Sequence, residues 1–267
     1  MQFKALAGEN VRVVGRSTSI APGGRRYIVN EFLNNAYALA RRRFDIYHPA
    51  HHRYMPLARA RRMVVTRHDC THEKLPAEFR YLDRVLRAKR ALFARADKIV
   101  CISEASRQDL LRFYNVDSGK TRVIHHGFTR LQCSPEAAAE LQRHIRRDYV
   151  LHVAWRVSYK NFRGLLRAFR DAGLHQTMDL LVVGGGPMSP EDKRLISALG
   201  LSQAVVQIGL VTDTLLTEAY AGAKVLAYPS LSEGFAFLPW KPCIWDAPCC
   251  CATRFSARGL WRCPVLL

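Results

Sequence analysis

The 267-residue sequence has no run of about 18 apolar residues, which is the length needed to cross the hydrocarbon core of a membrane. Residues 1–10 also lack the apolar core of a secretory signal peptide. Paired C-x2-C spacings are absent, as are helix-turn-helix patterns and aromatic stacking motifs. These absences predict a cytoplasmic protein with no transmembrane helix and no metal site, and they argue against nucleic acid as a partner.

Acidic residues are scarce compared with basic ones. The sequence holds 41 Lys and Arg against 22 Asp and Glu, which gives a net charge of +19. Residues 1–133 have 26 basic and 11 acidic side chains, whereas residues 134–267 have 15 and 11. A basic first half suits the anionic headgroups of a membrane surface. The alternative is a solvated surface without a binding role, and composition alone does not separate the two.

What the sequence does contain is a series of short apolar segments that alternate with helical patterns. Strands are predicted at residues 149–154, 179–183, 204–209 and 223–228, with an amphipathic helix at residues 162–172. Continuous apolar strands alternating with helices predict an α/β fold, in which both faces of a parallel sheet are covered. Ligands of such sheets bind at the carboxyl ends of the strands.

Charged residues and glycines gather in the loops that follow these strands. Arg156 and Lys160 lie four positions apart, so both can contact one anionic group beside the N-terminus of the next helix. Gly184 to Gly186 end the second strand and let the backbone approach a ligand closely. Glu233 follows a Pro-Ser turn, where its carboxylate can accept two sugar hydroxyls. Two cations for a diphosphate and a carboxylate for a sugar indicate a nucleotide-sugar site, which is one option among several on this chemistry alone.

Four motifs, in the right order, resemble the retaining GT-B glycosyltransferases of family 4, in the mannosyltransferase-like branch. They are His152-Val-Ala-Trp-Arg-Val-Ser-Tyr-Lys-Asn, Val182-Val-Gly-Gly-Gly-Pro, Ala219-Tyr-Ala-Gly-Ala and Tyr228-Pro-Ser-Leu-Ser-Glu-Gly-Phe. The resemblance spans roughly residues 25–239. It implies a GT-B fold of two Rossmann-like domains, and it makes Glu233 the first residue of a Glu-x7-Glu motif. The donor contacts that it implies come from Arg156, Lys160, Gly185, Gly186, Glu233, Gly234 and Phe235.

The first half contains a second set of predicted strands, at residues 11–14, 44–49, 63–66, 96–102 and 120–125. Helices are predicted at residues 25–43 and 104–114, and residues 59–62 are predicted as a basic loop. Ser103 directly precedes the second helix, and its hydroxyl can accept a free backbone N–H there. The half is therefore expected to form an α/β domain of its own.

His68 and Asp69 follow the predicted strand at residues 63–66. A histidine there can hydrogen-bond a sugar hydroxyl, with the aspartate orienting it, or it can simply be a satisfied loop residue. The resemblance favours the first interpretation, because the family carries a histidine–aspartate pair that faces its cleft. It implies a catalytic contact from His68, alongside Glu233. The acceptor-side residues that it implies are Asp69, Glu73, His126 and Gly127.

Domain boundaries follow from the motifs and from the polar, charged composition of residues 129–148. The prediction is a partial N-terminal acceptor-side domain at residues 1–130, a linker at 131–148, a nucleotide-sugar-binding domain at 149–239 and an aberrant tail at 240–267. The family's first strand and glycine-rich loop are absent or replaced in residues 1–24. Both domains are therefore expected to be incomplete.

The tail has an unusual composition, since it holds five of the eight cysteines. A metal site and disulfides are two interpretations. A frame shift fits better, because permitted codons for residues 240–251, read one nucleotide earlier, can spell Leu-Glu-Ala-Met-His-Leu-Gly-Cys-Pro-Val-Leu-Leu, as in the family. Lys241 then stands where the second glutamate is expected. The later strands and helices of the domain are expected to be lost.

The function that the resemblance implies is transfer of a hexose, with retention, from a nucleotide sugar to a saccharide or lipid-linked acceptor. Mannose is the expected sugar and GDP-mannose the expected donor. No cofactor is predicted, because the nucleotide sugar is a substrate. The protein is expected at the inner face of the membrane as a peripheral protein. Because of Lys241, activity is expected to be impaired, and the alternative is a non-catalytic remnant or basic binding protein.

Overall fold

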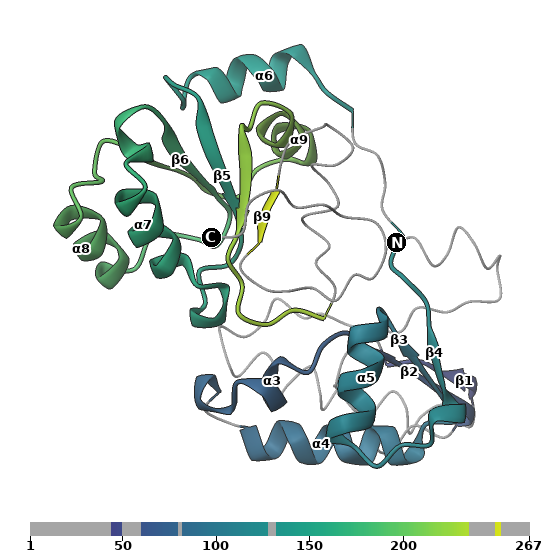
Figure 1. Cartoon of the computed structure of the whole chain (residues 1–267). Coiled ribbons are helices and arrows are strands. Elements are labelled where there is room, and N and C mark those ends of the chain that lie inside the picture. Colours follow the sequence, from purple (N-terminus) through teal and green to yellow (C-terminus); the bar gives the residue numbers. More distant parts are fainter. Residues whose placement is uncertain (1–43, 50–59, 80–81, 128–131, 235–248, 252–267) are drawn as a thin grey trace, which may run out of the picture. The chain divides into compact units, whose positions relative to one another are not determined.

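The computed structural model describes residues 44–49, 60–79, 82–127, 132–234 and 249–251. Packing divides the chain into two compact units, of which the first comprises residues 1–68 and 81–124 and the second residues 69–80 and 125–267. Each unit is built on a parallel sheet (Figure 1). Within the described part of the chain, no helix is both long and apolar enough to span a bilayer. The strand predicted at residues 11–14 and the helix predicted at 25–43 lie outside the described residues.

The first unit contains a sheet with strand order β1-β2-β3-β4 among its described residues, and every neighbouring pair is parallel. Its strands are β1 (Phe44–Tyr47), β2 (Ala60–Arg67), β3 (Lys98–Cys101) and β4 (Thr121–Val123). The four strands predicted in this region are confirmed, but the prediction of a loop at residues 59–62 is wrong for residues 60–62, where β2 begins. Ala60 and Arg62 pair with Phe44 and Ile46 of β1, so the backbone of these positions has ladder partners.

Two helices, α4 (Leu82–Arg95) and α5 (Glu104–Phe113), complete the core of the first unit. Leu92 and Phe93 of α4 and Leu110 of α5 are buried with Val65 and Ile99 of the sheet. The sequence prediction includes α5 but not α4.

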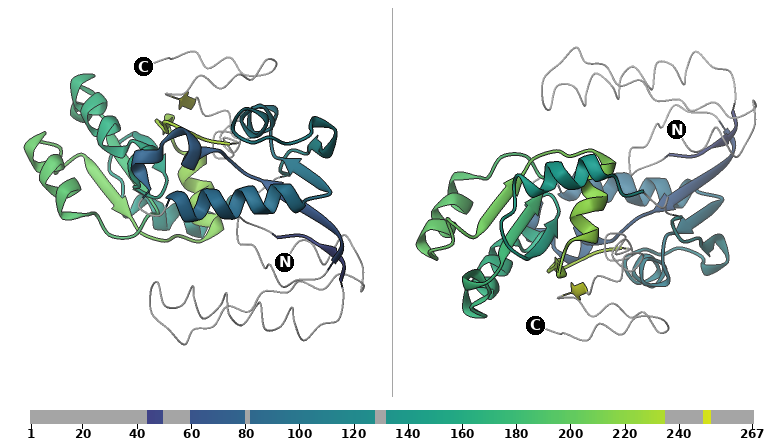
Figure 2. Two further views of the ribbon diagram at one scale, coloured as in Figure 1. Left: turned by 90° about the horizontal axis from the view of Figure 1, so that it is seen from below. Right: turned by 90° about the horizontal axis from the view of Figure 1, so that it is seen from above.

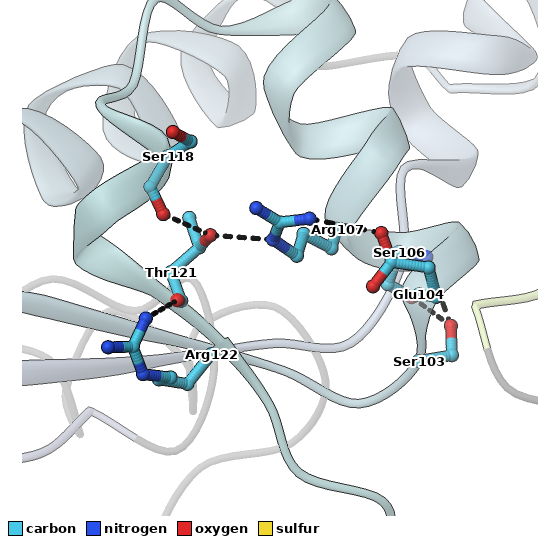
Figure 3. A network of polar contacts seen from close by, with 7 residues as sticks. All are labelled: Ser103, Glu104, Ser106, Arg107, Ser118, Thr121 and Arg122. Carbon is cyan, nitrogen blue, oxygen red and sulfur yellow. Dashed lines mark hydrogen bonds and ion pairs between the residues drawn. The ribbon is translucent and has the colours of Figure 1, made fainter.

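The predicted N-cap of α5 is confirmed by a small polar network (Figure 3). The Ser103 hydroxyl accepts the Ser106 backbone N–H at 3.0 Å, and the Ser106 hydroxyl donates to the His68 carbonyl at 3.0 Å. Arg107 extends the network, because its Nε donates to the Thr121 hydroxyl at 2.8 Å. These bonds connect the start of α5 with the end of β2 and the start of β4.

The second unit has a sheet with strand order β7-β6-β5-β8-β9 among its described residues, again with parallel neighbours. Its strands are β5 (Tyr149–Val153), β6 (Asp179–Val183), β7 (Val205–Ile208), β8 (Val225–Tyr228) and β9 (Cys249–Cys251). The four strands predicted between residues 149 and 228 are confirmed, as is their parallel arrangement. All five residues of β6 are buried, which explains why the four residues that follow Asp179 are apolar.

Helices cover both faces of this sheet (Figures 1 and 2). On one face, α6 (Pro135–Gln142) and α9 (Asp213–Ala221) pack over Leu181 and Val183 of β6. On the other face, α7 (Phe162–Asp171) and α8 (Pro190–Ala198) pack over Leu180 and Val182. Successive residues of one strand therefore supply two separate cores. The remaining described helices are α3 (Thr71–Lys74) and the 3-10 turns η2 (Pro76–Glu78), η3 (Ser118–Lys120), η4 (Ser158–Lys160) and η5 (Leu174–Gln176).

Two parts of the second unit differ from the prediction. The segment predicted as a linker, residues 131–148, contains α6, whose Ala137 and Leu141 are buried in the core. The tail is predicted to lose its strands, yet Cys249–Cys251 forms β9 and pairs with Leu226 to Tyr228. Cysteine is a small apolar residue, which a parallel strand accommodates. The other residues of the tail lie outside the described part of the chain.

Candidate functional site

The candidate site lies in the second unit, in the loops that follow the carboxyl ends of β5, β6 and β8. The loop after β5 carries both Arg156 and Lys160 and ends in the turn η4. Asn161 follows with a left-handed backbone, φ +55°, and α7 begins at Phe162. Both cations therefore lie between a buried strand and the N-terminus of a helix, as the sequence predicts.

The Arg156 guanidinium is bound by the glycine turn that follows β6. Its Nη1 donates to the Gly184 carbonyl at 2.8 Å, and its Nη2 donates to the carbonyls of Gly185, at 3.0 Å, and Gly186. Gln207 of β7 also donates its side-chain amide to the Gly186 carbonyl, at 2.5 Å. Burial lowers the pKa of Arg156 from its usual value, although the residue stays charged at neutral pH. Gln207 is a residue that the sequence does not mark, since nothing in its strand points to a site.

The glycine turn allows this contact because all three of its residues have positive φ, +82°, +73° and +68°. Gly185 is the most constrained of them. A Cβ on this residue would lie 2.8 Å from the Ala154 carbonyl oxygen and 2.9 Å from Arg156 Nη1. The group that lies close to Gly185 in the structure is the loop carrying Arg156, whereas the sequence predicts an approach to a ligand.

Lys160 forms an ion pair with Glu233, which lies 73 positions later in the chain. Both side chains are largely buried, with exposed fractions of 16% and 13%. The Lys160 ammonium also lies 5.3 Å from the ring centroid of Tyr159 and 5.5 Å from that of Tyr228, distances typical of cation–π contacts. Its Nζ is 3.5 Å from the Tyr228 hydroxyl. The structure therefore brings together two of the predicted donor residues.

His152 of β5 lies buried close to this pair. Its Nδ1 is 3.1 Å from the Ala227 carbonyl oxygen, so Nδ1 carries the proton and donates. Its ring stacks on Phe162 with centroids 5.4 Å apart, and Nε2 is buried without a hydrogen-bond partner among the described residues. Burial lowers the pKa of His152 to about 4, and the positive charges of Arg156 and Lys160 act in the same direction. The imidazole is therefore neutral at physiological pH.

Residues 69–79, which belong to the second unit, pack against the loops of the site. Thr71 Oγ1 and Ser232 Oγ are 3.4 Å apart, and both residues are buried. The Ser158 hydroxyl donates to the Glu78 carboxylate, and the Phe79 ring lies 6.2 Å from that of Tyr159. Residues 71–79 therefore contact both the loop after β5 and the loop after β8, a role that the sequence does not reveal.

The predicted acceptor-side residues lie at several places. His68 directly follows β2 in the first unit, where burial and then the charge of His68 lower the pKa of His48. In the second unit, Asp69 accepts the Thr71 backbone N–H at 2.9 Å, and Glu73 lies in the first turn of α3. His126 and Gly127 are exposed in the irregular segment after β4, and Gly234 is buried after Glu233. Phe235 lies outside the described residues.

The arrangement can bind an anion that also carries hydroxyl groups. It offers two cations on one loop, a partly buried carboxylate and a glycine turn. Among the residues that the structure describes, no group of three or more His, Cys, Asp or Glu side chains could hold a metal ion.

Comparison with family models gives two matches that together span most of the chain. Residues 3–130 match the model described as Glycosyltransferase Family 4, and residues 136–239 match the model described as Glycosyl transferases group 1. The second match includes every described residue of the candidate site except residues 69–79, which lie within the first match.

Two curated relatives from Escherichia coli are similar in sequence. The O-antigen chain mannosyltransferase B is 30% identical over 216 residues, which cover 75% of this chain and 55% of that protein. The serotype-specific mannosyltransferase WbdA is 27% identical over 164 residues, which cover 57% of this chain and 20% of that protein. The chain thus spans about half the length of the first relative and a fifth of the second.

Solved structures with a similar fold include two at 18% identity. The sucrose-phosphate synthase from Thermosynechococcus elongatus has a TM-score of 0.69, over 90% of this chain and 64% of that chain. Anabaena HepE, in complex with UDP and glucose, has a TM-score of 0.65, over 88% of this chain and 65% of that chain. At this identity the similarity concerns the fold alone.

Proposed function

We propose that the chain is a GT-B glycosyltransferase, since residues 3–130 and 136–239 match two glycosyltransferase family models, and that its second unit binds a nucleotide sugar at the carboxyl ends of β5, β6 and β8. The activity proposed for the intact enzyme from which this chain derives is transfer of the sugar to an acceptor hydroxyl, with the anomeric configuration of the sugar retained. The observation that carries the proposal is that the loop after β5 carries two cations, Arg156, which is bound by the glycine turn after β6, and Lys160, which is paired with Glu233. A nucleotide sugar has the two chemistries that this cluster matches, a diphosphate and sugar hydroxyls.

Each side chain has a distinct task in this proposal. Arg156 and Lys160 contact the diphosphate and stabilise the negative charge that develops on it as the bond to the sugar breaks. Glu233 accepts hydrogen bonds from hydroxyls of the sugar, and the next two residues, Gly234 and Phe235, complete the proposed donor contacts. The glycine turn at Gly185 and Gly186 lets the backbone approach the nucleotide.

GDP-mannose is the proposed donor, because the curated relatives are named mannosyltransferases. HepE is named as a complex with UDP and glucose, so UDP-glucose is the matched comparison ligand. Titration calorimetry with both nucleotide sugars distinguishes them. Tighter binding of UDP-glucose would refute the choice of GDP-mannose while leaving a nucleotide-sugar site in place.

The donor site is tested by removing its cations one at a time. Arg156→Ala and Lys160→Ala should each weaken GDP-mannose binding by about tenfold or more, since a hydrogen bond to a charged group contributes about 1.5–3 kcal/mol. Arg167→Ala is the matched control, because Arg167 is an exposed cation on α7 of the same unit. Equal affinities for the two site variants and the control would refute the donor assignment.

The acceptor side of the proposal involves His68, Asp69, Glu73, His126 and Gly127. His68 contacts the transferring sugar or the acceptor hydroxyl, and the acceptor is a saccharide or a lipid-linked saccharide. Unchanged transfer by His68→Ala in an active, frame-restored enzyme would refute that contact. Peripheral binding to an anionic membrane is proposed for the basic first half, and vesicle flotation that is insensitive to salt and lipid charge would contradict it.

A second candidate is a non-catalytic remnant, favoured by Lys241 at the position of the second glutamate. The match to the second family model ends at residue 239, next to the proposed frame shift. Sequencing the DNA around the codons for Pro239 and Trp240 tests this origin of the tail. A neighbouring frame that is closed by stop codons would refute it, whereas an open frame spelling Leu-Glu-Ala-Met would support it. A transfer assay on the expressed chain then separates an enzyme from a remnant.

A further inference from the structure

The two cations of the candidate site are already neutralised or occupied by groups of the protein. Three backbone carbonyls of the glycine turn hold the Arg156 guanidinium. The Glu233 carboxylate holds the Lys160 ammonium, and both of these side chains are largely buried. Tyr159 and Tyr228 flank the ammonium with their rings, so the ion pair is enclosed.

This ion pair sets a condition on any anionic ligand. A phosphate that binds the Lys160 ammonium must either displace the Glu233 carboxylate or lie beside it. In the second case, two anions that contact the same ammonium repel each other. The displaced carboxylate is left in a largely buried position, where an unpaired charge is unfavourable. A bare nucleoside diphosphate satisfies Lys160 but offers nothing to Glu233.

An intact nucleotide sugar removes this conflict. Its diphosphate binds the Lys160 ammonium, and its sugar hydroxyls donate hydrogen bonds to the Glu233 carboxylate, which Lys160 no longer contacts. Both members of the ion pair exchange one partner for another, and neither is left alone. The site therefore has an arrangement that favours the complete donor over the diphosphate product.

From this geometry we infer that Glu233 is a specificity-determining residue that disfavours a bare nucleoside diphosphate, because it competes with the diphosphate for Lys160. The inference rests on the proposed donor site, and it adds that the carboxylate acts against one ligand while assisting the other. The competing account is that Glu233 merely holds Lys160 in place for the phosphate. The two accounts predict opposite effects on diphosphate affinity when the charge of Glu233 is removed.

The test is the affinity of the full chain for GDP and for GDP-mannose, measured by titration calorimetry for wild type, Glu233→Gln and Glu140→Gln. The control residue Glu140 is an exposed carboxylate on α6 of the same unit. In Glu233→Gln the affinity for GDP should rise by about tenfold, as expected when a charge-assisted pair no longer competes. The ratio of the two affinities should fall toward one, while Glu140→Gln keeps the wild-type ratio.

The wild-type chain gives a measurement that does not depend on the variant folding. GDP-mannose should bind more tightly than GDP, and equal affinities would overturn the inference. Weaker or unchanged GDP binding in a Glu233→Gln variant with a wild-type circular dichroism spectrum would also overturn it. Failure of the wild-type chain to bind either ligand, or UDP and UDP-glucose, is a different pattern that refutes the donor site itself.

Discussion

Substitution of Gly185 tests how closely the glycine turn after β6 packs against the loop that carries Arg156. Its φ is +73°, in the left-handed region that residues with a side chain rarely adopt. A Cβ would lie 2.8 Å from the Ala154 carbonyl oxygen, 2.9 Å from Arg156 Nη1 and 3.3 Å from the Arg156 backbone nitrogen. Two of these atoms belong to the backbone and cannot rotate away. Gly185→Ala must therefore shift the loop that carries Arg156.

The magnitude has two parts that a control can separate. The left-handed conformation costs about 1–2 kcal/mol for a residue with a Cβ. The steric overlap adds about 1–3 kcal/mol, as overpacking usually does. Gly200 has a φ of +67°, but a Cβ on this residue would meet no atom within 4 Å, so Gly200→Ala should show the first part alone.

The assay is urea unfolding of the wild-type chain and both variants, followed by circular dichroism. The free energy of unfolding should fall by about 1–3 kcal/mol more in Gly185→Ala than in Gly200→Ala. Only Gly185→Ala should weaken GDP-mannose binding. Equal losses of stability in the two variants would refute the close approach between the glycine turn and the Arg156 loop.

Two further predictions concern pH and helix capping. Burial lowers the pKa of His152 to about 4 from 6.5, so the unfolded chain takes up a proton before the folded one and stability should fall as the pH drops from 6.5 to 4. The loss in the free energy of unfolding approaches about 3 kcal/mol at the acid end. Unfolding measured across this range should show a weaker dependence of stability on pH for His152→Gln than for the wild type. The same dependence in both proteins would exclude His152 as the source. Ser103→Ala should lower the free energy of unfolding by about 1 kcal/mol through loss of the α5 cap. Ser118→Ala should have little effect because Ser118 contributes its carbonyl to the network, so similar losses from both serine variants would contradict the capping role.

The second sheet could be predicted closely because its strands are buried on both faces. Tyr149–Val153 and Asp179–Val183 are apolar at nearly every position, and short apolar runs of this length are typical of strands that are buried on both faces. The start of β2 could not be predicted in this way, since Arg61 and Arg62 are exposed and the strand there depends on pairing with β1. Tertiary pairing overrides local composition in that case.

Helix α6 shows a local signal that is present but outweighed by composition. Ser134 accepts the Ala137 backbone N–H, and Pro135 occupies the first helical position, so the sequence Ser-Pro-Glu marks a helix start. The surrounding polar residues instead favour the prediction of a linker. Burial of Ala137 and Leu141 against the core explains why the segment is helical.

The sequence predicts which residues belong to the site but not which of them contact one another. Arg156, Lys160 and Glu233 stand out by their positions after strands, yet the ion pair joins residues 73 positions apart. The binding of Arg156 by three glycine carbonyls depends on how two loops meet, which no local pattern encodes. The same holds for His152, whose burial and stacking on Phe162 follow from the packing of β5 against α7.

The central claim is that the loops after β5, β6 and β8 form a nucleotide-sugar site, and direct binding tests it most simply. Titration of the full chain with GDP-mannose should give saturable binding that GDP displaces and that Arg156→Ala weakens by about tenfold or more. Absence of saturable binding by GDP-mannose and UDP-glucose alike would contradict the account. Binding that Arg156→Ala leaves unchanged would place the ligand somewhere else on the protein.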